Sequence, residues 1–207
     1  MSQNKNASLH DEYAADYDKQ VLAYECYITD VLFGLCYEYL QPGEKLLEAG
    51  IGSGLSSLPF AKVGLEVHGM DFSPAMLEIC RAKNFTASLK QHDLQKVPWP
   101  YQDDSFSVLV CCGVFHFIHG LEAIFSEARR VLESGGIFAF TTKVYSAQET
   151  SQGEVIRENS GDFEIYSHAP RVIETLLGKE AFTPLKVQKC FVGEEIFTCW
   201  VVKKEAG

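Results

Sequence analysis

From residue 45 to residue 142 the chain alternates short apolar segments with segments of helical periodicity. Five apolar segments have the length of a buried strand: Lys45–Ala49, Glu66–Asp71, Leu89–Asp93, Phe106–Cys112 and Ile137–Thr142. Between them, residues 55–63, 74–83 and 121–132 have the spacing of helices, and Ser73-Pro74 is a strong helix start. Pro59 requires the first of these helices to begin late or to kink. This alternation predicts right-handed crossovers and a parallel sheet.

The C-terminal part of the chain breaks this alternation. Pro170 begins a predicted helix that runs to about Phe182, and Leu185–Phe191 and Ile196–Lys203 follow as strands. Only residues 192–195 separate the two strands, which is too few for a crossover helix, so the strands must form an antiparallel hairpin. A parallel sheet that ends in such a hairpin differs from the all-parallel sheet of a dinucleotide-binding domain.

Composition excludes several classes of partner. The 207 residues fit one domain, and 18 Lys and Arg against 28 Asp and Glu give a net charge of −10. This charge disfavours nucleic acids and anionic membranes, so we expect neither as a partner. Seven cysteines form no C-x-x-C pair and follow no signal peptide, which favours reduced thiols in a cytoplasmic protein. The uncharged run Ser105–Leu121 contains two glycines and two histidines, so a strand plus a loop is favoured over a membrane span.

A glycine-rich motif, Glu48-Ala49-Gly50-Ile51-Gly52-Ser53-Gly54, lies between the first predicted strand and the first predicted helix. Glycines at such a turn let the backbone bend tightly and let a ligand approach closely. Asp71, which ends the second strand, can accept hydrogen bonds from both hydroxyls of a ribose. The spacing is not the G-x-G-x-x-G of dehydrogenases, because Leu55 stands at its third position, and no Lys follows Gly54 as a P-loop requires. The motif predicts a ligand with a ribose and without a pyrophosphate.

Four further motifs follow in the sequence: Gly69-Met70-Asp71-Phe72-Ser73-Pro74, Asp93-Leu94, Asp104-Ser105-Phe106 and Arg130-Val131-Leu132-Glu133-Ser134-Gly135-Gly136. In this order the motifs resemble those of the class I S-adenosylmethionine-dependent methyltransferases, in particular the small ubiquinone-biosynthesis-like group. The resemblance covers roughly Tyr13 to Thr142. It implies a Rossmann-like three-layer α/β sandwich with a seven-stranded, mostly parallel sheet, to which the C-terminal hairpin adds one antiparallel strand. It also implies S-adenosylmethionine as cofactor and S-adenosylhomocysteine as product.

The same resemblance implies a set of cofactor-binding residues near the carboxyl ends of the strands and in the N-terminal segment: Tyr17, Glu48, Gly50, Gly52, Gly54, Asp71, Phe72, Met76, Asp93, Leu94, Cys112 and Gly113. Within this set Asp71 would hold the ribose, and Phe72 and Met76 would flank the adenine. Simpler explanations stay open. Phe72 and Met76 suit a helix-packing core, Asp93 suits a strand-end cap, and Tyr17 suits a helix that packs on the domain.

Methyl transfer from a sulfonium is an in-line displacement that depends on alignment and on the exclusion of water, so no catalytic residue is strictly required. His116, four residues past Cys112, is the candidate general base, and a hydrogen-bonded structural histidine is the alternative. No group of cysteines and histidines has the spacing of zinc ligands, so no metal is expected.

On this interpretation the chain is one methyltransferase domain with four parts. These are an N-terminal helical lid (1–40), a cofactor-binding core (43–142), a substrate loop (143–168) and a C-terminal helix and β-hairpin (169–207). The expected substrate loop is polar and long for a simple connection, which is typical of a lid or a substrate-binding loop. The candidate acceptor contacts, each of which can also be merely exposed, are Tyr13, His116, Tyr145, Tyr166 and His168.

The leading hypothesis is therefore methyl transfer to a small-molecule acceptor, with a neutral or cationic acceptor favoured by the acidic chain. A nicotinamide-dependent oxidoreductase shares the fold class and the acidic ribose-binding residue, but the glycine spacing and the terminal hairpin count against it. A non-catalytic cofactor-binding regulatory protein is the other alternative. The sequence leaves open the identity of the acceptor, the atom that is methylated and the oligomeric state.

Overall fold

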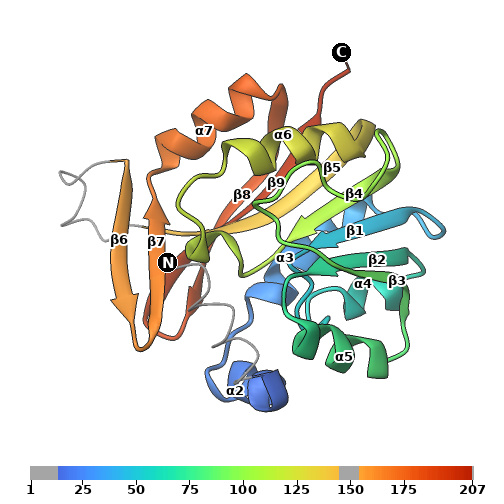
Figure 1. The fold of residues 1–207 in the computed structure, drawn as a ribbon. Coiled ribbons are helices and arrows are strands. Elements are labelled where there is room, and N and C mark those ends of the chain that lie inside the picture. Colours follow the sequence, from blue (N-terminus) through green and yellow to red (C-terminus); the bar gives the residue numbers. More distant parts are fainter. Residues whose placement is uncertain (1–13, 145–153, 207) are drawn as a thin grey trace.

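The computed structural model describes residues 14–144 and 154–206, and within these residues seven strands form one sheet (Figure 1). The strands are β1 (Lys45–Ala49), β2 (Glu66–Asp71), β3 (Thr86–Gln91), β4 (Phe106–Cys111), β5 (Leu132–Lys143), β8 (Phe182–Val192) and β9 (Glu195–Lys204). Their order is β3-β2-β1-β4-β5-β9-β8. Strands β1 to β5 are parallel, and β9 is antiparallel to both of its neighbours, β5 and β8. The predicted mostly parallel sheet with one antiparallel strand from the C-terminal hairpin is confirmed.

Helices cover both faces of the sheet: α3 (Ile28–Cys36), α4 (Leu58–Lys62), α5 (Pro74–Ala82), α6 (Glu122–Val131) and α7 (Pro170–Lys179). Neighbouring strand residues point to opposite faces, so Leu46 and Leu47 of β1 enter different layers. Leu47 packs with Leu109 in the core beneath α6 and α7, whereas Leu46 packs with Val108 in the core beneath α3, α4 and α5. The result is a three-layer sandwich in which the apolar runs of the central strands are buried on both faces.

The helices begin where the sequence indicates. The Ser73 side chain accepts a hydrogen bond from the backbone N–H of Met76 at 3.1 Å and caps α5, with Pro74 as its first residue. The helix after the glycine-rich motif starts late, at Leu58, with Pro59 in its first turn. This is the position that Pro59 allows, because the lost N–H is not needed there. Within residues 14–144 and 154–206 no helix is long and apolar enough to cross a membrane.

Strand β3 begins and ends earlier than predicted. It spans Thr86–Gln91, whereas the sequence suggested Leu89–Asp93. Because β3 lies at the edge of the sheet and is only half buried, it lacks the continuous apolar run that marks the central strands. Asp93 therefore lies in the loop that follows β3 rather than at the end of the strand.

The expected substrate loop contains a β-hairpin. Strands β6 (Val155–Ser160) and β7 (Phe163–His168) pair in antiparallel register, and Gly161 has a φ of +58° at the turn between them. The two-residue connection Gly161-Asp162 is a hairpin signal that the sequence analysis overlooked. Charged and polar residues interrupt the apolar alternation of the two flanking strands, so neither segment was predicted as a strand.

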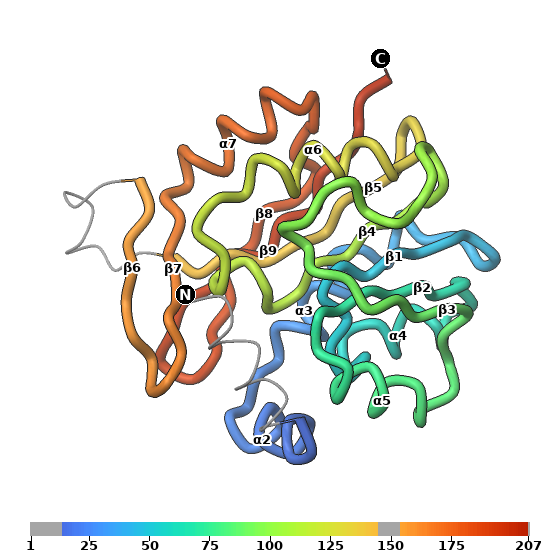
Figure 2. The backbone as a smooth tube through the Cα atoms, in the orientation of Figure 1, coloured from blue at the N-terminus to red at the C-terminus, as the bar shows by residue number. Residues whose placement is uncertain are grey.

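Two peripheral elements lie beyond the carboxyl ends of the parallel strands. Figure 2 shows α2 (Tyr17–Ala23) and the β6–β7 hairpin on the side toward which the arrows of β1 and β4 point in Figure 1. A short helical turn, η1 (Ala14–Asp16), precedes α2, and another, η3 (Phe115–Phe117), follows β4 and packs against β7. Within the expected N-terminal lid, α3 packs into the core against the sheet, whereas α2 has no fully buried residue.

Candidate functional site

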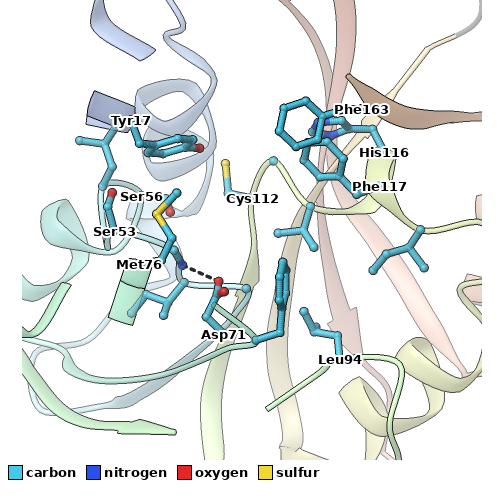
Figure 3. Close-up of a pocket in the computed structure, with 18 of the residues that line it drawn as sticks. Tyr17, Ser53, Ser56, Asp71, Met76, Leu94, Cys112, His116, Phe117 and Phe163 are labelled. Carbon is cyan, nitrogen blue, oxygen red and sulfur yellow. Dashed lines mark hydrogen bonds between the residues drawn. The ribbon is translucent and has the colours of Figure 1, made fainter. Parts of the chain in front are cut away.

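A cavity of about 920 Å³ opens at the carboxyl edge of the sheet (Figure 3). The glycine-rich motif, α2, η3 and β7 contribute to its walls. The chain passes from β1 outward to β2 and β3, and then returns across β1 to β4. Ligands of open α/β sheets bind at such a reversal of strand order, just outside the carboxyl ends of the strands.

The cavity brings together most of the candidate residues: Tyr17, Gly50, Gly52, Asp71, Phe72, Met76, Asp93, Leu94, Cys112, Gly113, His116 and Tyr166. Three other candidates, Glu48, Gly54 and His168, do not line it. Tyr13 and Tyr145 lie outside the described residues. The cavity also includes residues that the sequence analysis did not select, among them Ser53 and Phe163.

Asp71 connects the end of β2 to the glycine-rich motif. Its Oδ2 accepts a hydrogen bond from the backbone N–H of Gly52 at 2.8 Å, the contact drawn as a dashed line in Figure 3. Its Oδ1 accepts one from the backbone N–H of Ser73 at 2.9 Å. These donors hold the carboxylate in a fixed orientation at the cavity wall.

Gly52 and Gly113 leave room on the cavity side of the backbone. Both line the cavity in the left-handed conformation, with φ of +52° and +71°. A Cβ built on either residue meets no protein atom within 4 Å. A side chain at these positions would therefore project into open space, where it would compete with a ligand that approaches the backbone.

Gly54 serves packing rather than the cavity. Its φ is +81°, and a Cβ built there would lie 2.7 Å from both Cys80 Sγ and Phe85 Cζ. These atoms belong to the helix and the chain that follow β2, so Gly54 lets the motif pack closely against them. Gly54 does not line the cavity, and its missing side chain serves this close packing.

Glu48 is fully buried behind the glycine-rich motif. The hydroxyls of Ser56 and Ser57 donate hydrogen bonds to its two carboxylate oxygens. Burial raises the pKa of Glu48 to about 8, an effect that outweighs the two hydroxyl donors and is increased by the nearby charge of Asp71. Glu48 reaches the cavity only indirectly, through Ser56, which lines it.

Glu48→Gln is expected to remove a pH dependence of stability. The native pKa of about 8 lies above the usual 4.5, so the native state binds more protons than the unfolded state between these values. The stabilising contribution is complete below pH 4.5 and is lost as the pH rises through 8, by up to about 1.4 kcal/mol per pH unit. Urea unfolding from pH 5 to pH 8 should therefore show wild type losing stability relative to the variant.

The exposed carboxylate of Glu78 provides a matched control for this experiment. Glu78 pairs with Arg81 on the surface of α5, with a side chain that is 74% exposed. The difference in unfolding free energy between wild type and Glu78→Gln should stay constant over the same pH range. A constant difference for Glu48→Gln as well would contradict the raised pKa.

Asp18 fastens α2 to the glycine-rich motif. Its Oδ1 accepts a hydrogen bond from Ser53 Oγ at 2.5 Å, and its Oδ2 accepts one from Lys83 Nζ at 2.6 Å. Tyr17, the preceding residue, lines the cavity, and burial raises the pKa of its phenol so that the ring stays neutral. The three residues Asp18, Ser53 and Lys83, here called the α2 clasp, thus hold Tyr17 at the cavity.

The side of the cavity formed by the ends of β2 and β3 combines apolar and polar side chains. Met76 and Leu94 line the cavity and are each only 3% exposed. Asp93 lines the cavity, and its Oδ1 accepts a hydrogen bond from the backbone N–H of Gln95 at 3.0 Å. Asp93 is therefore a loop cap as well as a cavity residue.

The opposite side of the cavity is lined by rings. Phe117 of η3 lies with its ring centroid 5.5 Å from that of Phe163 on β7. The His116 ring lies 4.0 Å from Phe117 and 5.4 Å from Phe197 of β9. Figure 3 shows His116, Phe117 and Phe163 grouped across the cavity from Tyr17 and Met76.

His168 has a structural position behind this ring-lined side. It is 2% exposed, and its Nε2 donates a hydrogen bond to the backbone oxygen of His119 at 3.1 Å. Burial lowers the pKa of His168, so the ring is neutral, and Nδ1 has no hydrogen-bond partner among the described residues. His168 does not line the cavity, and its side chain connects β7 to the loop after η3.

Cys112 lines the cavity as a neutral thiol. It is 9% exposed, and burial raises its pKa well above the usual value, so it is not a nucleophilic thiolate. Within residues 14–144 and 154–206, no three His, Cys, Asp or Glu side chains come together in a way that could hold a metal ion.

The strand order, the glycine-rich motif bound to Asp71 and the cavity at the carboxyl edge define the Rossmann-like architecture of S-adenosylmethionine-dependent methyltransferases. The family described as "Methyltransferase domain" matches residues 47–140. These residues make up slightly less than half of the chain, so this part of the chain is similar to the methyltransferase domain family.

Two curated relatives show similarity over about half of this chain. The malonyl-[acyl-carrier protein] O-methyltransferase of Serratia marcescens is 32% identical over 101 residues, which are 49% of this chain and 39% of that protein. The demethylmenaquinone methyltransferase of Tropheryma whipplei is 33% identical over 99 residues, which are 45% and 39% of the two chains. The matched part of this chain thus covers about two fifths of the length of these relatives.

A solved structure shows the same fold over the whole chain. The 1,6-didemethyltoxoflavin-N1-methyltransferase of Burkholderia thailandensis, with bound 1,6-didemethyltoxoflavin and S-adenosylhomocysteine, superposes with a TM-score of 0.74. The superposition covers 100% of this chain and 91% of that chain at 14% sequence identity. At this identity the similarity describes the fold alone.

Proposed function

We propose that this protein transfers the methyl group of S-adenosylmethionine to a small-molecule acceptor bound on the ring-lined side of the cavity. The observation that carries the proposal is the contact between Asp71 and the backbone N–H of Gly52 at the wall of the cavity. It places an oriented carboxylate beside a backbone that has no side chain on its cavity side. A ribose-containing ligand needs both features.

The described residues fit the cofactor in three respects. The carboxylate of Asp71 would accept hydrogen bonds from the ribose hydroxyls. Phe72, Met76 and Leu94 would offer apolar surface to the adenine, and Asp93 would meet its polar edge. The open backbone at Gly52 and Gly113 would leave space for the methionine part.

When bound, S-adenosylmethionine supplies a methyl carbon attached to a cationic sulfur, and S-adenosylhomocysteine is the product after transfer. The protein's own contribution would be alignment and the exclusion of water. Tyr17, held by the α2 clasp, would close the cavity near Cys112, and its neutral ring would tolerate a neighbouring cation. His116 would receive the proton of an acceptor hydroxyl or amine on a ring nitrogen.

A small-molecule acceptor is supported by the dimensions of the cavity and by the names of similar proteins. A volume of about 920 Å³ is in the range of small-molecule sites, and the cofactor would take part of it. Demethylmenaquinone and 1,6-didemethyltoxoflavin methyltransferases are named for small acceptors. The match to the methyltransferase family counts against the nicotinamide-dependent alternative.

Formation of S-adenosylhomocysteine in the presence of acceptor pools tests the proposed function. Wild-type protein is incubated with S-adenosylmethionine and pools of neutral, cationic and anionic small molecules, and the product is quantified. We expect product with at least one pool and none without an acceptor. Tight cofactor binding without turnover by any pool would instead favour the non-catalytic regulatory alternative.

Asp18→Ala is expected to weaken S-adenosylhomocysteine binding by about 3- to 10-fold, because it removes the two partly exposed contacts, to Ser53 and to Lys83, that hold α2. Isothermal titration measures the dissociation constant. Asp16→Ala is the matched control, since Asp16 pairs with the exposed Lys19 on the same segment. Equal affinities for the two variants would contradict a closing role for the α2 clasp.

A further inference from the structure

A buried threonine supports the cavity wall at the point where β4 ends. The strand ends at Cys111, and two residues later the backbone N–H of Gly113 donates a hydrogen bond to Thr141 Oγ1 at 2.8 Å. Thr141 lies near the carboxyl end of the neighbouring strand β5 and is fully buried. Its hydroxyl therefore serves as the acceptor for an N–H that lies beyond the paired part of β4.

The same hydroxyl also contacts the residue before Gly113. Burial raises the pKa of the Cys112 thiol well above its usual value, and a hydrogen bond with Thr141 opposes this rise. A hydroxyl can donate one hydrogen bond while it accepts another, so Thr141 can hold two consecutive residues of the chain. Both of these residues line the cavity, whereas Thr141 does not. An effect of Thr141 on a ligand must therefore pass through Cys112 and Gly113.

Gly113 needs such an anchor because a glycine restricts its own backbone least. Its φ is +71°, and a Cβ built on it meets no protein atom within 4 Å. Gly52 is held in a similar way, since its N–H donates a hydrogen bond to Asp71 Oδ2, also at 2.8 Å. Each of these two open glycines of the cavity wall is thus held in place by one side-chain acceptor.

The geometry points to Thr141 as a positioning residue for the methionine part of the cofactor. This inference rests on the proposed function, in which the open backbone at Gly113 leaves space for that part of the cofactor. Asp71 orients the glycine-rich motif beside the ribose, and Thr141 holds the wall beyond β4 at the other end of the ligand. Loss of the hydroxyl would free Gly113 from this anchor, so affinity should fall for ligands that carry the amino-acid part.

Thr141→Val tests this role, because valine has nearly the shape of threonine but lacks the hydroxyl. Two ligands are titrated calorimetrically: S-adenosylhomocysteine, and 5′-methylthioadenosine, which keeps the adenosine and the sulfur but lacks the amino-acid part. We expect Thr141→Val to bind S-adenosylhomocysteine about 3- to 10-fold more weakly than wild type, and 5′-methylthioadenosine within about twofold of wild type. Thr141→Ser keeps the hydroxyl and should bind both ligands as wild type does.

Thr142→Val is the matched control from the next position of β5. The Thr142 hydroxyl is also buried, and it accepts a hydrogen bond from Trp200 Nε1 at 3.0 Å. Trp200 belongs to the core beneath α6 and α7, whereas Cys112 belongs to the core on the other face of the sheet. Urea unfolding should show a similar loss of stability for both valine variants, and Thr142→Val should keep wild-type affinity for both ligands.

Gly113→Ala provides a second test that applies even if Thr141→Val does not fold. Its methyl group would project into the cavity, so it too should weaken S-adenosylhomocysteine more than 5′-methylthioadenosine. Equal losses for the two ligands in Thr141→Val or in Gly113→Ala would overturn the inference. Wild-type affinity of Thr141→Val for S-adenosylhomocysteine, or a selective loss in Thr142→Val, would also overturn it. Absence of S-adenosylhomocysteine binding by the wild-type protein would instead contradict the proposed function.

Discussion

Asp71→Ala is expected to weaken S-adenosylhomocysteine binding by about 30- to 1000-fold, equivalent to roughly 2–4 kcal/mol. The substitution removes the carboxylate that would accept both ribose hydroxyls. It also frees the backbone N–H of Gly52, which donates to Asp71 at 2.8 Å, and so loosens the motif on the cavity side. The dissociation constant is measured by isothermal titration, and urea unfolding establishes how much of the variant is folded.

An exposed aspartate serves as the control for Asp71→Ala. Asp103 pairs with Arg130 away from the cavity, and its side chain is 71% exposed. Asp103→Ala should bind S-adenosylhomocysteine as wild type does. If folded Asp71→Ala also binds within threefold of wild type, Asp71 does not hold the ribose.

Gly54→Ala is expected to destabilise the domain by about 2–5 kcal/mol. The left-handed backbone costs an L-residue roughly 1–2 kcal/mol, and insertion into a packed region adds about 1–3 kcal/mol. The added methyl group would lie 2.7 Å from Cys80 Sγ and Phe85 Cζ, where atoms must move to admit it. The free energy of urea unfolding measures this loss.

Gly52→Ala is the matched variant, which is expected to affect ligand binding more than stability. It carries the same methyl group two residues earlier, in open space on the cavity side of the backbone. We expect a stability loss of only about 1–2 kcal/mol, from the left-handed backbone, together with clearly weakened S-adenosylhomocysteine binding. Two results would contradict the assignment of Gly52 to the ligand and of Gly54 to packing. One is wild-type affinity of Gly52→Ala for S-adenosylhomocysteine, and the other is a wild-type free energy of unfolding for Gly54→Ala.

The fold was predictable because its signals are local. Buried central strands such as Phe106–Cys111 are continuous apolar runs, and the Ser73-Pro74 start of α5 is a two-residue pattern. The hairpin in residues 155–168 was missed, although Gly161-Asp162 indicates it, because its strands are polar. The hairpin places the ring of Phe163 and the carboxylate of Glu164 at the cavity. This placement could not be inferred from the sequence, because it depends on how the hairpin packs against the rest of the fold.

The sequence predicts most of the residues at the site, but not which of them face the cavity and which serve packing. Asp71 and the glycine-rich motif are recognisable from order and spacing along the chain. Which glycine faces a ligand depends on atoms such as Cys80 Sγ, which are distant in sequence from Gly54. The contact of Asp18 with Lys83 joins residues 65 positions apart, and the burial of Glu48 depends on all the surrounding layers. Local sequence patterns carry no information about such long-range contacts.

The most direct test of the central claim is a parallel titration of the wild-type protein with S-adenosylhomocysteine and with NAD. Both ligands contain an adenosine, so the comparison isolates the part of the ligand that the glycine-rich motif accepts. We predict saturable binding of S-adenosylhomocysteine and binding of NAD at least about 100-fold weaker, a difference of roughly 3 kcal/mol. A preference for NAD, or equal affinity for the two ligands, would contradict the account of this site as a methyltransferase cofactor site.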